Sequence, residues 1–156
     1  MRKEIVTKLI KSMPGISYNE IVRDTGLSNG VVSHYIIKLI DSGEIEKEGE
    51  KRGKYFTTNI LKKDRILITV LRNKTNNEIF KYIMKQTNCN QVVGANKISK
   101  KIKKSGSTVS VSLKILQKNN ILERVIMNKN SKLTNDIGYR VSNIEVWTKY
   151  FIKYNL

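Results

Sequence analysis

The spacing of apolar residues predicts the same helix twice in this chain. Val32, Ile36 and Leu39 stand at i, i+4 and i+7, a spacing that places them on one face of a helix. The match between the two copies has no gap and continues past the helix into the next strand, so two related small domains are predicted. The second copy of the spacing lies 77 positions later, at Val109, Leu113 and Leu116.

Short elements before the first repeated helix belong to the same small domain. A helix is predicted over residues 4–11 and ends at Met13-Pro14-Gly15. Ser17 and Glu20 have the spacing of a capping box, which opens a second short helix. Gly26 suits a left-handed turn after that helix. The first helix is predicted to bury Ile5, Leu9 and Ile10.

The repeated helix is followed by a predicted hairpin. Ser28 is expected to cap the helix, which covers residues 29–40. Residues 44–48 and 54–57 have strand character and flank a basic, glycine-containing turn. Two helices, a turn, the repeated helix and a hairpin "wing" form the order of a winged helix-turn-helix domain.

A joining segment precedes the second copy. In residues 64–72, Ile66 pairs with Val70 and Leu67 pairs with Leu71 at i, i+4. We interpret this segment as a helix, and a buried strand is the alternative, because apolar residues also follow one another there.

The second domain repeats the order of the first with differences in detail. Thr75 and Glu78 have capping-box spacing at the start of a helix that is predicted to end near Lys85. The loop over 87–93 is expected to be longer than its counterpart in the first domain. The remaining predicted elements are helices over 95–104 and 108–117, strands over 122–127 and 139–141, and a basic wing tip over 128–132.

The chain ends in an amphipathic segment with an aromatic stripe, in a helix that the first domain is expected to lack. The stripe could pack on its own domain or on the first domain. We favour a third interpretation, a homodimer interface, because the stripe has more Trp, Phe and Tyr side chains than the terminal helix of a small domain needs. The residues assigned to it are Ile144, Trp147, Tyr150, Phe151 and Tyr154.

The charge of the chain indicates its partner. The 156 residues carry a net charge of +17, so a polyanion is the expected ligand. Residues 1–63 contribute +4 (12 basic, 8 acidic) and residues 64–156 contribute +13 (18 basic, 5 acidic). No apolar run is long enough to span a bilayer, and the start of the chain reads as an amphipathic helix rather than a signal peptide. Cys89 is the only cysteine, which favours the cytoplasm over an oxidising compartment.

Each repeated helix presents polar residues on the face opposite its apolar stripe. Short hydroxyl and amide side chains with a few cations suit the edges of bases and the phosphates of a major groove. Wing cations can reach phosphates or the minor groove. The DNA-binding residues predicted for the first domain are Ser28, Asn29, Ser33, His34, Lys38, Lys51, Arg52 and Lys54.

The second domain carries the densest basic cluster, directly before its repeated helix. These lysines are placed to hold the DNA backbone beside the groove. The DNA-binding residues predicted there are Lys97, Lys100, Lys101, Lys103, Lys104, Ser107, Thr108, Ser110, Lys114, Lys129 and Lys132.

No catalytic constellation is found in the sequence. There is no glycine-rich phosphate loop and no cluster of cysteine and histidine ligands, so no metal and no cofactor is predicted. With one histidine and one cysteine, nucleophile–base pairs are nearly excluded. The chain contains seven tyrosines, so a tyrosine nuclease or recombinase stays open on residue types alone.

The chain resembles the archaeal tandem winged-helix transcription regulators, which are related to the ArsR and MarR groups and include activators of archaellum operons. The resemblance lies in Leu27-Ser28 with the repeated helix, in residues 64–73, and in the segment from Glu78 to Met84. It implies promoter binding, usually by a dimer.

Two departures from the pattern affect the second domain. Lys103-Lys104 stand where the first domain has Gly26-Leu27, which predicts a distorted or longer helix-turn-helix. Val111 replaces an expected polar contact residue. It could meet a thymine methyl group, or the second domain could hold the backbone while the first reads bases.

The sequence therefore predicts a mostly α-helical protein with small β-hairpin wings, built from two tandem winged helix-turn-helix domains and a C-terminal helix. Its predicted function is sequence-specific binding of double-stranded promoter DNA, without enzymatic activity, as a homodimer that can contact the transcription machinery. The alternatives are a non-specific architectural protein and a winged-helix protein-interaction module. The first winged helix-turn-helix domain is predicted over 1–60, a linker helix over 61–74, the second domain over 75–142 and the C-terminal helix over 143–156.

Overall fold

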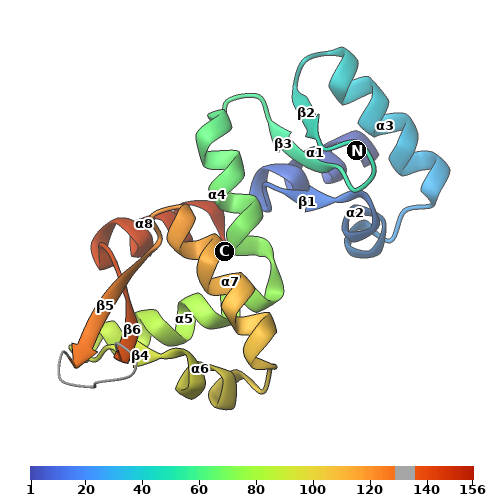
Figure 1. The fold of residues 1–156 in the computed structure, drawn as a ribbon. Helices are drawn as coiled ribbons and strands as arrows, with labels where there is room; N and C mark the ends of the chain where they lie inside the picture. Colours follow the sequence, from blue (N-terminus) through green and yellow to red (C-terminus); the bar gives the residue numbers. More distant parts are fainter. Residues whose placement is uncertain (129–135) are drawn as a thin grey trace. The chain divides into compact units, whose positions relative to one another are not determined.

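A computed structural model describes residues 1–128 and 136–156 of the chain (Figure 1). By their contacts the residues group into two compact units. Unit 1 consists of Met1–Thr69 together with Tyr154–Leu156, and unit 2 consists of Val70–Lys153. No helix among the described residues is long and apolar enough to cross a membrane.

Unit 1 has the winged helix-turn-helix order that the apolar spacing predicts. Its three strands form an antiparallel sheet in the order β1-β3-β2, with Ile16 opposite Tyr55 and Ile45 opposite Thr57. The strands β2 and β3 form the wing. The elements are α1 (Arg2–Ser12), β1 (Ile16–Ser17), α2 (Tyr18–Thr25), α3 (Asn29–Asp41), β2 (Ile45–Glu48), β3 (Lys54–Thr57) and α4 (Lys62–Arg72), of which residues 70–72 group with unit 2.

The core of unit 1 forms where α3 packs on α1, α2 and the sheet. Val32, Ile36 and Leu39 are at most 4% exposed, as their spacing predicts. In α1 the buried residues are Val6 and Ile10, whereas Ile5 lies on the exposed side. Of the predicted stripe, Ile10 is confirmed and Leu9 packs against the core, whereas Ile5 was wrong, because i and i+4 select Val6 with Ile10.

Unit 2 repeats this architecture with a constant offset of 77 residues through its central part. The elements β4, α6 and α7 match β1, α2 and α3 in both their first and their last residues. The sheet order, β4-β6-β5, is equivalent to that of unit 1. The elements are α5 (Lys74–Asn88), β4 (Val93–Gly94), α6 (Ala95–Ile102), α7 (Gly106–Lys118), β5 (Leu122–Asn128), β6 (Asp136–Val141) and α8 (Ile144–Tyr154).

The joining segment and the C-terminal segment are equivalent helices. Each has 11 residues and follows the last strand of a wing, α4 after β3 and α8 after β6. The expectation that the first domain lacks such a helix was therefore wrong. In α4 the residues that are completely buried are Ile68 and Leu71, whereas Ile66 is exposed, so the predicted Ile66/Val70 pair is not its buried stripe.

The start of α5 differs from the sequence prediction. The helix begins at Lys74, and Asn73 caps it by accepting a hydrogen bond from the backbone N–H of Asn76. The side chain of Asn76 is buried and donates to the carbonyl of Val70, the kind of carbonyl that a helix leaves unbonded at its C-terminus. The predicted capping box at Thr75 is therefore wrong, because the asparagine before it fills that role.

The end of α5 also differs from the prediction. The helix continues to Asn88, and Cys89 caps it. The loop predicted over 87–93 is therefore shorter than expected. Thr87 stays helical and uses its hydroxyl twice, donating to the carbonyl of Ile83 and accepting from the backbone N–H of Val141 in β6.

Candidate nucleic-acid interface

The two helix-turn-helix motifs have the same turn, although their sequences differ there. Gly26 ends α2 with φ 65° and ψ 11°, and Lys103 ends α6 with φ 56° and ψ 46°. Each donates its backbone N–H to the carbonyl four residues earlier, Val22 in one unit and Ser99 in the other. The predicted distortion of the second motif is therefore wrong, since lysine adopts the left-handed conformation in place of glycine.

In unit 1, α3 presents the predicted polar face. Asn29, His34 and Lys38 are exposed, and Ser33 is half-buried. Ser28 stands at the N-cap without making a side-chain cap bond. The hydroxyl of Tyr18 donates to the carbonyl of Asn29 at 2.8 Å, a bond that joins the start of α2 to the start of α3.

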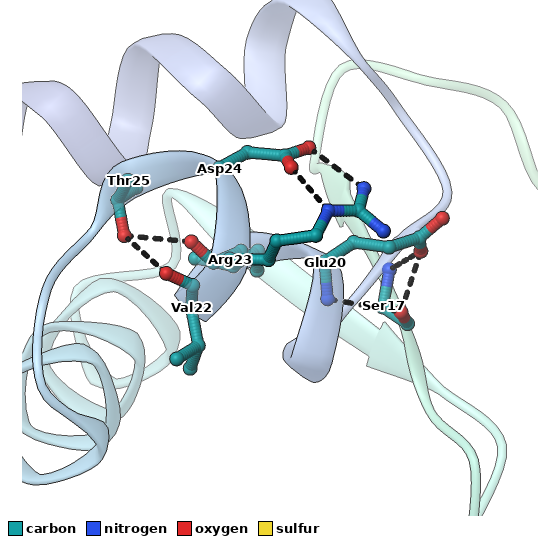
Figure 2. A network of polar contacts seen from close by, with 7 residues as sticks. Ser17, Glu20, Val22, Arg23, Asp24 and Thr25 are labelled. Carbon is teal, nitrogen blue, oxygen red and sulfur yellow. Dashed lines mark hydrogen bonds and ion pairs between the residues drawn. The ribbon is translucent and has the colours of Figure 1, made fainter.

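The polar groups of α2 bond largely to one another (Figure 2). The predicted capping box is confirmed, with Ser17 N–H donating to Glu20 at 2.8 Å and Glu20 N–H donating to Ser17 Oγ at 3.4 Å. Arg23 donates from Nε to the carboxylate of Asp24 at 2.6 Å. This helix therefore has one cation, already paired, and two acids, so its contribution to anion binding is small.

The wing of unit 1 and the start of α2 enclose a basic cleft of about 680 Å³. Lys47 Nζ donates to the carbonyl of Glu50 at 3.1 Å, and Lys54 Nζ lies 3.7 Å from Oε2 of Glu20. The exposed wing cations that the sequence predicted, Lys51 and Arg52, make no ion pair with a described residue. The cations that line the cleft are Lys47, Lys51, Arg52 and Lys54.

Sequence reasoning missed the residue that holds this wing. Arg65 of α4 is 2% exposed, and its Nε donates to the carbonyl of Ile60 at 2.8 Å. Its Nη1 donates to Glu46 and, at 3.1 Å, to Glu48, both on β2. The hydrogen bond from Arg65 lowers the pKa of Glu46 below its ordinary value. An arginine beside the apolar run 66–68 and two glutamates at i, i+2 were the signal in the sequence.

Every lysine of the predicted cluster in unit 2 is exposed. The cluster comprises residues of α6 and of the turn before α7, and no ion pair joins any of them to a described residue. From residue 79 to residue 122 the chain has nine lysines and no acidic residue, so no carboxylate from this stretch can neutralise them. The members of this α6 lysine cluster are Lys97, Lys100, Lys101, Lys103 and Lys104.

The helix α7 carries the second predicted reading face. Its N-cap is Ser105, whose Oγ accepts from the N–H of Thr108 at 3.2 Å. Ser107, Thr108 and Lys114 are exposed, and Ser110 is half-buried. The helix therefore begins two residues earlier than predicted, and Ser107 lies in its first turn.

The wing of unit 2 is described only in part. Lys129 and Lys132, predicted to contact DNA, lie outside the described residues. The paired strands β5 and β6 place Glu123 opposite Arg140, and Arg140 Nε donates to Glu123 at 2.9 Å. A second cleft lies between this hairpin and the start of α6, at the place of the basic cleft in unit 1.

Two aromatic residues of α8, Trp147 and Phe151, pack within unit 2. Phe80 of α5 stacks on Phe151 with ring centroids 4.8 Å apart, and meets the edge of Trp147 at 6.2 Å. Tyr150 contacts Trp147, which is 7% exposed. Tyr154 groups with unit 1, where its buried side chain donates from the hydroxyl to Asp64 at 3.2 Å. Packing on its own domain therefore accounts for Trp147 and Phe151, and their assignment to a dimer interface is corrected. Ile144 is half-buried at the start of the same helix.

The described part of the chain has no cluster of side chains suited to bind a metal ion. No group of three or more His, Cys, Asp or Glu side chains there could hold a metal ion. Cys89 is exposed at the end of α5.

Comparisons with known proteins add little. No family model matches the chain, and no curated protein matches it. Among solved structures, ScpB from Mycobacterium tuberculosis aligns over 95% of this chain and 92% of its own, with 11% identity and a TM-score of 0.37. Because that score is low, the winged-helix assignment rests on the element order and sheet topology described above.

Proposed function

We propose that the protein is a transcription regulator that binds double-stranded DNA through the helix-turn-helix motifs and wings of both units. It acts in the cytoplasm without enzymatic activity and as a homodimer. The resemblance of the sequence to the archaeal tandem winged-helix regulators supports this proposal. That resemblance also suggests promoter regions as the sites and the transcription machinery as a further partner.

The observation that carries the proposal is the α6 lysine cluster. Five exposed ammonium groups stand on the helix and turn that lead into α7. The first turn of α7 adds backbone N–H groups and exposed hydroxyls, a combination that favours phosphate. The helix α7, which has 13 residues and follows these phosphate-binding groups in the chain, is of the kind that enters a major groove.

Sequence specificity is proposed mainly for α3. Asn29 and Ser33 can exchange hydrogen bonds with base edges, and His34 can donate or accept. The cations of the adjacent basic cleft can hold the flanking backbone. A non-specific architectural protein is the second candidate, and the unneutralised charge of unit 2 favours it, because phosphate contacts carry no sequence information.

Fluorescence anisotropy at physiological salt tests the proposal. The promoter of the protein's own operon and those of neighbouring operons would be compared with scrambled duplexes of equal length, followed by selection from a random library. A regulator is expected to prefer its site by about a thousandfold or more. Equal binding to every duplex, lost steeply with salt, would favour the architectural candidate, and no binding at low salt would refute both.

A matched pair of variants tests the role of α6. Lys100 and Arg23 occupy equivalent positions, but Arg23 is already paired with Asp24. Lys100→Gln is expected to weaken binding to all duplexes equally and to reduce the salt slope by about one. Arg23→Gln should leave both quantities nearly unchanged, and an equal effect of the two substitutions would contradict the assignment of α6 as the backbone grip.

A further inference from the structure

Two aliphatic side chains are exposed on the reading helix of unit 2. Val111 is 58% exposed and Ile115 is 37% exposed. With Thr108 they stand at i, i+3 and i+7, which places all three on one face of α7. This apolar stripe is separate from the face that packs into the core, so the fold of unit 2 does not require it.

The equivalent face of unit 1 is different. By the 77-residue offset, the residue of α3 that is equivalent to Val111 is His34, and the residue equivalent to Ile115 is Lys38. Both residues of α3 are polar and exposed. The two helices have the same length and the same core positions, so an aliphatic pair at these two positions is particular to α7. The exposed isoleucines of α3, Ile37 and Ile40, lie on another face of that helix.

The surroundings of the apolar stripe indicate what covers it. Lys114 and Lys118 are exposed on the same helix, and the α6 lysine cluster precedes it. An apolar protein surface would bring these ammonium groups out of water without partners, which costs free energy. A duplex offers both chemistries together, because phosphates flank a major groove in which the C5-methyl group of thymine is the apolar feature.

We infer that α7 reads thymine methyl groups in the major groove, with Val111 as the main contact. The N-terminal residues of a reading helix contact base edges, and Val111 lies in the first half of α7. Ile115 and the methyl group of Thr108 extend the apolar contact along the groove. This inference rests on the proposed function and names the base feature that unit 2 recognises.

Replacing thymine by uracil tests the inference without knowledge of the operator. Two A·T duplexes of identical sequence, one with thymine and one with uracil, differ at each such pair only in the C5-methyl group. The protein is expected to bind the thymine duplex more tightly, by about fourfold for each methyl group buried, which corresponds to the transfer of one CH₂ group out of water. Anisotropy titrations of both duplexes at one salt concentration measure this ratio.

Two variants locate the contact. Val111→Ser removes both methyl groups from an exposed position and should leave folding intact, which thermal unfolding checks. It is expected to remove most of the preference for thymine, because Val111 is the main contact, while retaining affinity for the uracil duplex. Ile37→Ser removes an exposed aliphatic side chain from α3 that is not among the predicted DNA-binding residues, and this control should keep the preference. Because both duplexes are measured with every variant, any difference in their flexibility cancels.

The outcomes separate this inference from the proposed function. Equal binding of the two duplexes by the unaltered protein overturns the methyl contact and leaves DNA binding established. A preference that persists undiminished in Val111→Ser overturns the role of Val111. Absence of binding to either duplex at low salt overturns both the inference and the proposed function. A protein that self-associates through this stripe, shown by sedimentation of the unaltered chain and Val111→Ser, also overturns the inference.

Discussion

The helices α2 and α6 occupy equivalent places in the two units and carry opposite charge. Both have eight residues, and both bury one isoleucine, Ile21 in α2 and Ile98 in α6. Outside its core face α2 carries the half-buried Glu20 and an exposed Arg23–Asp24 ion pair, whereas the exposed positions of α6 hold lysines. The fold therefore depends on the buried positions. The charge of the exposed positions can differ between the units, so each unit can have its own role in binding.

The helices that follow the wings show a second difference of this kind. Arg65 in α4 and Trp147 in α8 are both buried fourth from the start of an 11-residue helix. Arg65 bonds to the glutamates of β2, and Trp147 packs on Phe80. Unit 1 thus holds this helix with charged hydrogen bonds, and unit 2 holds it with aromatic contacts.

The largest predicted effect comes from removing these two anchors. Trp147→Ala should lower the free energy of unfolding of unit 2 by about 3 to 5 kcal/mol, since it deletes a large buried ring. Arg65→Ala should cost unit 1 about 2 kcal/mol, because hydrogen bonds of charged groups are lost but the glutamates regain water. Denaturant unfolding followed by far-UV circular dichroism measures both values. Val146→Ala, beside Trp147 and exposed, is the control, and a larger loss for Arg65 would reverse the comparison.

A smaller effect is expected at the turns. Lys103 adopts φ 56°, which is strained for a residue with a β-carbon, whereas Gly26 adopts φ 65° without that cost. Lys103→Gly should stabilise unit 2 by about 1 kcal/mol, and Gly26→Ala should destabilise unit 1 by a similar amount. Thermal and denaturant unfolding would detect the two opposite shifts.

Lys103 also links stability to the proposed function. Lys103→Gly removes both strain and charge, whereas Lys103→Gln removes only the charge. Both variants should weaken DNA binding equally, and only the first should be more stable. If Lys103→Gly bound DNA as well as the unaltered protein, the lysine would not be retained at this strained turn for its charge.

The sequence was most informative where a repeat or a period constrained several residues together. The two repeated helices, the wing of unit 1 and the bounds of α8 follow from apolar spacing and turn residues. The start of α5 did not follow, because Asn73, Thr75 and Asn77 are all acceptable caps by composition. Only the bonds of the neighbouring asparagines to the end of α4 select Asn73.

Side-chain pairing across distant segments was beyond the sequence. The partners of Arg65 lie 17 and 19 residues away, and those of Phe80 lie more than 60 residues away. A period within one helix identifies its buried face but does not name what covers it. For that reason the aromatic stripe of α8 was assigned to a second copy of the chain, although Phe80 of the same unit covers Trp147 and Phe151.

The smallest predicted effect concerns the N-caps of the two reading helices. Ser105 accepts a backbone hydrogen bond at the start of α7, and Ser28 makes no such bond at the start of α3. Ser105→Ala should therefore cost about 1 kcal/mol of stability, and Ser28→Ala should cost only a few tenths. Denaturant unfolding of both variants measures the difference.

The effect on DNA binding should have the opposite order, because the hydroxyl of Ser28 is not engaged in capping and can bond a phosphate. Ser28→Ala should therefore weaken DNA binding more than Ser105→Ala does. Equal losses of stability would mean that Ser28 also caps its helix in solution, which would remove this distinction between the units.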